Sequence, residues 1–389
     1  MKTSAQIESL LPTLTAWRHH LHSIPEIGLQ ETRTAAYVAG LLRGFGLEVV
    51  EGVGGTGVVA TLRGTRTGGR SIGFRAELDA LPMDEPPGVG YSSGNPGRMH
   101  ACGHDGHMAM LLGAARVLAE SGTNFAGAIH FIFQPGEEGL GGALAMLADG
   151  LFDRFPCDEI YATHNASRPL GQVAVHRGVL AAAADVFHVE IRGKGGHAAT
   201  PHDTVNPLHA AAKLLLALES LPARITDARL PSVVTVAALN GGDAFNVIPD
   251  RVRMSGTVRC LNNDARATLE TAIRRQVAAI ELAEGVEAQL SYDSVFSVTA
   301  NTAREADHVI AVAKRLLGAG NVVVDPPPEM GSEDFGYMLE QRPGCYFLLG
   351  QEDADHLPAC HDTNYDFNDR LLELGVNLWA ALAKDRLGL

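Results

Sequence analysis

Apolar residues recur along this chain with two different spacings, which separate predicted helices from predicted strands. Between residues 105 and 120 they recur every three or four positions, which gives one apolar stripe along a helix. The stripe consists of Met108, Leu111, Leu112, Ala115 and Leu118. Residues 128–134 form instead a short apolar and aromatic run that ends at Pro135 and Gly136, which predicts a strand.

Predicted helices and strands alternate up to about residue 178. We expect helices at 5–22, 30–46, 105–120 and 141–150, and strands at 47–52, 57–63, 71–78, 128–134 and 159–163. Alternation of this kind predicts an α/β architecture, in which helices cover a central sheet.

The order of predicted elements changes after about residue 180. We expect strands at 186–193, 232–239, 251–261 and 286–293, and helices at 205–221 and 264–283. The resulting order β-α-β-β-α-β is that of a ferredoxin-like α+β domain. In the second helix the predicted buried stripe is Leu269, Ala272, Ile273, Val277 and Ile280, and Asn263 or Asp264 can cap its start.

From about residue 295 the α/β pattern resumes. We expect helices at 302–317, 333–341 and 368–386, and strands at 322–324 and 345–349. A chain of 389 residues is long enough for two domains. We therefore predict that a small domain, residues 181–294, is inserted into a larger one made of residues 1–180 and 295–389.

Composition excludes several classes of partner. The chain has 31 Lys and Arg against 45 Asp and Glu, and the net charge of −14 repels phosphate backbones and anionic lipids. We therefore expect no nucleic-acid partner and no membrane partner. No stretch approaches the roughly 18 consecutive apolar residues of a membrane span, and we see no signal-peptide pattern. The five cysteines are widely scattered, which indicates reduced thiols and a cytoplasmic protein.

Candidate chemistry is densest in the segment HACGHDGH at residues 100–107. Cys102 and His104 are separated by one glycine and can bind one ion from a tight loop. The loop lies just before a predicted helix, whose N-terminus favours a thiolate at Cys102. The alternative is a polar loop whose histidines cap the helix, but three His, a Cys and an Asp within eight residues favour chemistry.

A second candidate is the segment QPGEEG at residues 134–139, at the end of the predicted strand 128–134. Ligands of open α/β sheets bind at the carboxyl ends of strands. Two adjacent acids there, Glu137 and Glu138, can divide the work between a metal ligand and a proton carrier. The alternative is an ordinary solvated turn.

Two more histidines are predicted to follow strands. His164 comes directly after the predicted strand 159–163, and His361 lies in the loop after the predicted strand 345–349. Cys, His and Glu together suit Zn²⁺ or Mn²⁺, whereas Ca²⁺ and Mg²⁺ prefer oxygen ligands alone. The Cys₄ or Cys₂His₂ spacing of a closed structural zinc site is missing.

Eight motifs, in order along the whole chain, resemble those of a known family. They are RAELDALPM (75–83), HACGHDGH (100–107), QPGEE (134–138), GKGGHAA (193–199), NVIPD (246–250), GTVR (256–259), GSEDF (331–335) and YDFND (365–369). The chain resembles the aminoacylase, hippurate hydrolase and auxin-conjugate hydrolase family of di-metal amidohydrolases. The resemblance implies a zinc-peptidase-like catalytic domain, with a central mixed sheet flanked by helices, and an inserted lid or dimerisation domain.

The resemblance also implies roles for individual residues. The implied ligands of two divalent ions, Mn²⁺ or Zn²⁺ with Co²⁺ or Ni²⁺ as alternatives, are Cys102, His104, Glu138, His164 and His361. Glu137 would be the general base, and Asp79 would orient a metal ligand or the base. His197, reaching from the partner subunit of a homodimer, would stabilise the oxyanion. Asn246 and Arg259 would contact the substrate, although Arg259 could equally form a surface ion pair.

The implied reaction is hydrolysis of the amide bond of N-acetyl or N-aroyl amino acids to a carboxylate and a free amino acid. Three alternatives stay open at this stage. They are a dipeptidase or aminopeptidase, a thiol hydrolase with Cys102 as nucleophile, and a metal-binding protein without activity. One segment departs from the family pattern, because His164 is followed by NASRPLG where relatives usually have a proline sooner.

Overall fold

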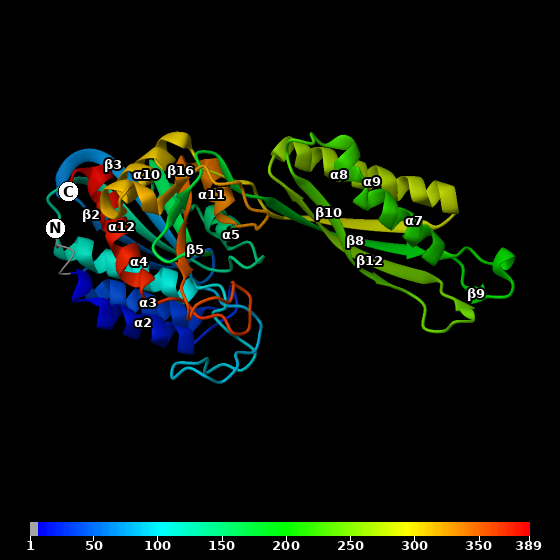
Figure 1. Ribbon diagram of the computed structural model, residues 1–389, viewed down its shortest axis with the longest axis horizontal. Coiled ribbons are helices and arrows are strands. Elements are labelled where there is room, and N and C mark those ends of the chain that lie inside the picture. The colour runs from blue at the N-terminus through cyan, green and yellow to red at the C-terminus, as the bar shows by residue number, and fades with distance from the viewer. Residues whose placement is uncertain (1–6) are drawn as a thin grey trace. The chain divides into compact units, whose positions relative to one another are not determined.

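A computed structural model describes residues 7–389 and divides them into two units (Figure 1). Each unit has its own buried hydrophobic residues. Unit 1 contains the described residues up to Leu180, together with Ala300–Pro327 and Asp334–Leu389. Unit 2 contains Ala181–Thr299 and Pro328–Glu333. Among residues 7–389, no helix has both the length and the apolar character needed to cross a bilayer.

Unit 1 is built on a mixed sheet of eight strands, which confirms the predicted α/β class. Their order is β1 (Glu48–Val53), β2 (Gly57–Arg63), β4 (Ala126–Gln134), β3 (Arg66–Glu77), β5 (Glu159–Pro169), β16 (Gly344–Glu352), β6 (Val173–Val175) and β15 (Val322–Val324). The four central strands β4, β3, β5 and β16 run parallel. Their carboxyl ends therefore lie along one edge of the sheet, where a ligand site is expected.

Helices cover both faces of this sheet. One face carries α2 (Leu11–Ser23), α3 (Thr32–Gly44), α4 (His104–Glu120), α10 (Ala303–Leu317) and α12 (Leu371–Leu387), and the other carries α5 (Gly142–Ala148), α6 (Leu151–Arg154) and α11 (Phe335–Gln341). Successive strand residues point to opposite faces of the sheet. Tyr161 therefore packs under the helices of the first face, and Ile160 packs under those of the other face. The predicted helix 5–22 begins outside the described residues and is observed as α2.

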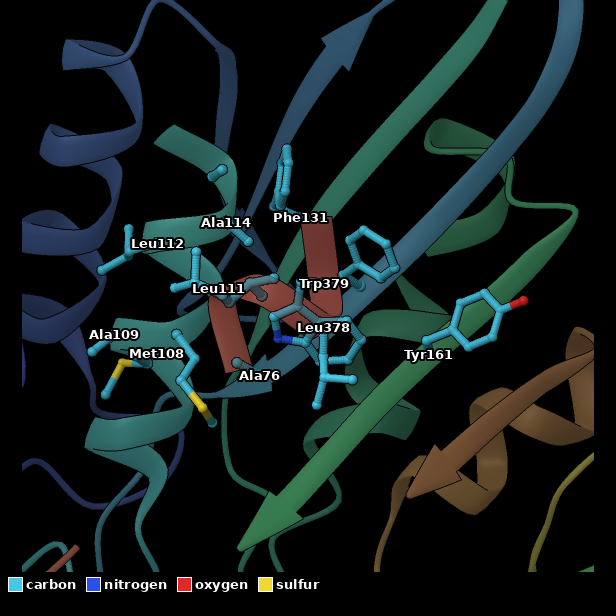
Figure 2. Close-up of a cluster of buried hydrophobic side chains, with 14 of the residues drawn as sticks. Ala76, Met108, Ala109, Leu111, Leu112, Ala114, Phe131, Tyr161, Leu378 and Trp379 are labelled. Carbon is cyan, nitrogen blue, oxygen red and sulfur yellow. The ribbon is translucent and has the colours of Figure 1, made fainter. Parts of the chain in front are cut away.

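The helix α4 is more deeply buried than its sequence pattern predicts. The predicted stripe is fully buried, but so is almost every other side of the helix, because α2, α3 and α12 pack around it. Figure 2 shows side chains of α4 and α12 meeting in this core. A side chain at Gly113 would come within 2.5 Å of Val376 on α12 and 2.7 Å of Leu14 on α2. The close packing fixes the start of α4, which carries His104.

Unit 2 has the predicted ferredoxin-like order. Its elements are β8 (Ala183–Arg192), α7 (Pro207–Glu219), α8 (Leu221–Ile225), β10 (Ser232–Asn240), β12 (Arg251–Cys260), α9 (Asn263–Glu284) and β13 (Glu287–Phe296). The four strands form an antiparallel sheet in the order β10-β12-β8-β13. The predicted stripe of α9 is buried in the core of this unit. The helix is capped by Asn262, not by Asn263 or Asp264, because the Asn262 side chain accepts the backbone N–H groups of Asp264 and Ala265.

Several short elements escaped the sequence analysis because two or three residues carry too little pattern. They are β6, β7 (Val179–Ala181), β9 (Gly196–His197), β11 (Val247–Ile248) and β14 (Thr299–Ala300), with the 3₁₀ turns Pro201–Asp203 and Ala319–Asn321. The strand β5 is also longer than expected. His164 lies inside β5, opposite Leu348 of β16, and not after the strand as we predicted. Pairing with β16 extends β5 through the polar segment that follows Thr163.

Candidate metal centre

Unit 1 brings the five predicted metal ligands together. The ligand atoms of Cys102, His104 and His164 lie within 4.8 Å of one another, and so do those of Cys102, Glu138 and His361. Cys102 belongs to both groups, so it would contribute to whichever of the two sets holds an ion. A third group, whose ligand atoms also lie within 4.8 Å of one another, consists of His104, Glu138 and the predicted base Glu137.

The loop between Cys102 and His104 depends on the glycine that separates them. Gly103 has a φ of 87°, a left-handed conformation that glycine adopts without strain. A side chain at Gly103 would also come within 2.2 Å of the Asn165 side chain. Glycine therefore allows the chain to turn sharply and to present both ligands on one side, as the spacing predicts.

The imidazoles of His104 and His164 present the same ring nitrogen to the site. His104 donates from Nδ1 to the backbone oxygen of Asp79 at 2.8 Å, and His164 donates from Nδ1 to the backbone oxygen of Asn165 at 2.7 Å. A carbonyl oxygen can only accept, so each Nδ1 carries a proton, and Nε2 is the ring nitrogen left to bind a metal. Hydrogen bonds of this kind orient histidine ligands in metal sites.

Asp79 connects two of the predicted ligands. Its carboxylate accepts the backbone N–H of Glu138 at 3.0 Å, while its backbone oxygen holds His104. Asp79 is fully buried and lies two residues after the end of β3. A position between two ligands is the one expected for a residue that orients them.

A second carboxylate, Glu31, holds the loop of Glu137 and Glu138 from the other side. The side chain of Glu31 accepts the backbone N–H of Gly136 at 2.8 Å and the hydroxyl of Thr56. Glu31 is fully buried, and burial raises its pKa. The sequence analysis missed Glu31, because it lies far from the acidic motif in the chain.

His361 occupies a strained part of the backbone. Its φ of 70° lies in the left-handed region, which costs a residue with a side chain roughly 1–2 kcal/mol. The conformation is held by its own N–H, which donates to Ala101 at 2.8 Å, and it places Nε2 3.3 Å from the Glu138 carboxylate. The hydrogen bond to Glu138 raises the pKa of His361.

The charges of the site favour a bound cation. Burial lowers the pKa of His104, but the hydrogen bond to Asp79 and the surrounding carboxylates outweigh burial and raise this pKa to about 10. The pKa of Cys102 is also raised, by a hydrogen bond to Cys360, by burial and by the charges of nearby acids. Our expectation of a thiolate favoured by the helix N-terminus was therefore wrong for the metal-free protein.

One buried atom that faces this cluster supports the fit of its side chains to a metal. His104 Nε2 has no hydrogen-bond partner among residues 7–389. Burying polar atoms without partners is costly, and a cation would satisfy such donors. Thiolate, imidazole and carboxylate together suit a transition metal.

A buried hydrogen-bonded chain beside the ligands was not predicted. His107 Nδ1 lies 2.7 Å from the Glu77 carboxylate, and His107 Nε2 lies 2.8 Å from the side-chain oxygen of Asn165. Asn165 in turn donates to the sulfur of Cys360 at 3.2 Å. His107 follows His104 by three residues on one helix face, a spacing that could have identified it. Asn165 is the first residue of the segment that departs from the family pattern.

The remaining predicted residues, His197, Asn246 and Arg259, belong to unit 2. His197 on β9 pairs with Val247 on β11, and the backbone oxygen of Asn246 accepts the N–H of Ala198 at 3.1 Å. The Nδ1 atom of His197 accepts the N–H of Ala199 at 3.0 Å. A neutral His197 therefore carries its proton on Nε2, and its exposed ring can donate to a ligand.

Arg259 lies half-buried on β12. Its guanidinium donates to the backbone oxygen of Val258 at 3.3 Å, and within residues 7–389 it has no carboxylate within 4.0 Å. The alternative of a surface ion pair therefore finds no partner in the described chain. Burial lowers the pKa of Arg259, although Asp185 opposes this effect.

Comparison with known proteins assigns the family. A family model described as peptidase family M20/M25/M40 matches residues 73–385. The chain belongs to this family. Within the M20/M25/M40 peptidases, the hippurate hydrolase of Campylobacter jejuni is 40% identical over 369 residues, which cover 94% of each chain.

Two further relatives come from Bacillus subtilis. The N-acetyl-L-cysteine deacetylase is 36% identical over 351 residues, which cover 90% of this chain and 83% of the relative. The crystal structure of the YxeP protein, described as a dinuclear metal binding peptidase of family M20, superposes with a TM-score of 0.82. The two sequences are 29% identical, and the superposition covers 97% of this chain and 98% of the YxeP chain.

Proposed function

We propose that this M20/M25/M40 family member is a metal-dependent amidohydrolase that cleaves N-acetyl or N-aroyl amino acids to a carboxylate and a free amino acid. The observation that carries the proposal is the cluster of Cys102, His104, Glu138, His164 and His361, with Glu137 beside it. The similarity to a hippurate hydrolase and to an N-acetyl-L-cysteine deacetylase supports this substrate class.

The five clustered side chains would hold two divalent ions, Mn²⁺ or Zn²⁺, with Co²⁺ or Ni²⁺ as alternatives. When bound, such ions supply Lewis-acid activation of water and of the substrate carbonyl. The dinuclear description of the YxeP protein supports the number of ions.

Glu137 is the proposed general base. It is 6% exposed and lies in one group with His104 and Glu138. Glu137 would take a proton from the attacking water and return it to the leaving amine nitrogen. Asp79 would keep Glu138 and His104 in position during these transfers.

Residues of unit 2 would complete the site. The Nε2–H of His197 suits donation to the developing oxyanion, and the guanidinium of Arg259 suits the substrate carboxylate. Asn246, next to His197 on the β9–β11 ribbon, would contact the acyl group or the amide. We further propose a cytoplasmic homodimer in which the partner subunit's His197 serves this site.

The surface of unit 2 supports a dimer. β10 is an edge strand of its sheet and exposes Val233 by 42% and Leu239 by 40%, while Leu216 on α7 is 71% exposed. Edge strands with apolar side chains tend to pair with another chain. Sedimentation of the purified protein would test this part of the proposal, and a monomer at micromolar concentration would contradict it.

Two alternative activities have less support than the proposed one. A thiol hydrolase with Cys102 as nucleophile needs a thiolate, whereas the surroundings of Cys102 raise its pKa. A dipeptidase or aminopeptidase would use the same metal centre, and the description of YxeP as a peptidase keeps it as the second candidate.

The test is a panel of N-acetyl and N-benzoyl amino acids against dipeptides, with metal content measured on the same preparation. We expect faster hydrolysis of the N-acyl amino acids by protein that contains divalent ions. Faster hydrolysis of dipeptides would favour the peptidase alternative, and no hydrolysis of either class would contradict the proposal.

A further inference from the structure

A second cysteine lies against the predicted ligand Cys102. Cys360 precedes His361, whose N–H donates to Ala101 at 2.8 Å, so the two loops are joined beside their cysteines. The sulfur of Cys360 donates to the backbone oxygen of Cys102 at 3.8 Å.

Cys360 is held in place but is not itself one of the clustered ligands. Its sulfur accepts a hydrogen bond from the Asn165 side chain at 3.2 Å. Within residues 7–389, none of the three-residue ligand groups includes Cys360. Asn165 is 3% exposed, so this hydrogen bond fixes the sulfur of Cys360 from the protein interior. Cys360 is thus placed to react with Cys102 and not to replace it as a ligand.

We propose that Cys102 and Cys360 form a disulfide when the metal-free protein meets a hydroperoxide, and that this disulfide prevents divalent ions from binding. The inference rests on the proposed function, in which Cys102 is a metal ligand. A sulfur in a disulfide has no thiolate to offer, so oxidation removes the donor shared by both ligand groups. A bound metal occupies the same sulfur and protects it.

The chemistry balances with hydrogen peroxide as the oxidant. The Cys360 sulfur attacks the peroxide, an S–O bond forms as the O–O bond breaks, and water leaves. The Cys102 sulfur then attacks the Cys360 sulfur, the S–O bond breaks, and a second molecule of water leaves. In total, two thiols and one hydrogen peroxide give one disulfide and two molecules of water.

The other three cysteines provide internal controls. Cys157, Cys260 and Cys345 are buried and form no disulfide. The thiols of Cys157 and Cys345 donate to backbone oxygens, of Phe155 and Tyr346. We therefore expect these three thiols to remain reduced under conditions that oxidise the pair.

The experiment treats the metal-stripped full-length protein with one equivalent of hydrogen peroxide. Free thiols are counted after denaturation, cross-linked peptides are identified by mass spectrometry, and Zn²⁺ uptake is measured by equilibrium dialysis. We expect the thiol count to fall from five to three, a peptide joined through Cys102 and Cys360, and loss of Zn²⁺ uptake that dithiothreitol restores. Protein loaded with Zn²⁺ before peroxide should keep all five thiols.

Two variants complete the test. Before oxidation, Cys360→Ser should bind as much Zn²⁺ as the wild type, and after oxidation it should give no cross-linked peptide. Cys345→Ser, the matched control, should cross-link like the wild type.

Three results would overturn the inference in distinguishable ways. If reduced protein binds Zn²⁺ but peroxide leaves five thiols, the disulfide is wrong while the proposed function stands. If the disulfide forms and Zn²⁺ uptake is unchanged, the disulfide does not control metal binding. If reduced protein takes up no divalent ion at all, both the inference and the proposed function fail.

Discussion

The carboxylate of Asp79 accepts the backbone N–H of Glu138 at 3.0 Å. Through this hydrogen bond, Asp79, which need not contact a metal ion, sets the position of Glu138, which would bind one. The backbone oxygen of Asp79 accepts a hydrogen bond from His104 Nδ1 at 2.8 Å, and the Asp79 carboxylate lies 3.4 Å from the same nitrogen. Substitution of Asp79 therefore removes the carboxylate from both ligands and keeps only the backbone contact to His104.

Asp79→Ala should weaken divalent-ion binding about 10- to 100-fold, as the loss of an outer hydrogen bond to a ligand usually does. The Glu138 N–H is left without its partner, which should also cost about 1–3 kcal/mol of unfolding free energy. Competition with a metal-binding dye measures the affinity, and urea unfolding measures the stability. Asp153→Ala, at an exposed position of α6, is the control. An unchanged affinity would remove Asp79 from the site.

Glu137→Gln should lower kcat by about 10² to 10⁴, because a positioned base is lost, and should leave the bound metal in place. Glu138→Gln is the matched comparison and should lower metal content instead. Turnover and metal content are measured on both variants. Loss of metal from the Glu137 variant would make Glu137 a ligand and not the base.

His197→Ala should raise the barrier by about 2.7–4 kcal/mol, which is the usual effect of removing one oxyanion donor. The effect should fall on kcat, because the hydrogen bond strengthens only as negative charge develops. His202→Ala, at another exposed histidine of unit 2, should have no effect. An unchanged kcat in the His197 variant would exclude it from catalysis.

The stability of unit 1 should fall at high pH because of His22. Burial lowers the pKa of His22, but its hydrogen bonds to Asp105 and Glu85 outweigh burial and the repulsion from Arg18, and raise this pKa to about 9. The folded protein therefore holds this proton more tightly than the unfolded chain does. The stabilisation is complete below the ordinary histidine pKa of 6.5 and is lost as the pH rises through about 9.

Urea unfolding of the wild type and of His22→Gln measures this effect. Between about pH 6 and about pH 9.5, the wild type should lose about 3 kcal/mol more unfolding free energy than the variant. Other titrating groups are common to both proteins and cancel in the difference. Parallel pH profiles of the two proteins would contradict the raised pKa.

Much of this architecture could be predicted because its signals are local. The stripe of α9 and the turn at Gly103 each depend on residues near one another in the chain, so spacing alone identifies them. Cys102, His104 and Glu138 lie in short motifs, whereas His164 and His361 were identified by their place after predicted strands and by the family resemblance.

The surroundings of the ligands could not be predicted, because their partners come from distant segments. Glu31 contacts Gly136 across 105 positions, and Asn165 contacts Cys360 across 195. Single residues without a motif carry no signal for such contacts. The burial of α4 on nearly all sides was missed for the same reason, because helices from both ends of the chain pack around it.

The most direct test of the account follows hydrolysis of N-benzoylglycine while Zn²⁺ or Mn²⁺ is added to metal-stripped, fully reduced protein. We predict no hydrolysis without metal and a rise to a plateau at about two ions per chain, which is the number of ions in the proposed site. Full hydrolysis of N-benzoylglycine by the metal-stripped protein would contradict the central claim.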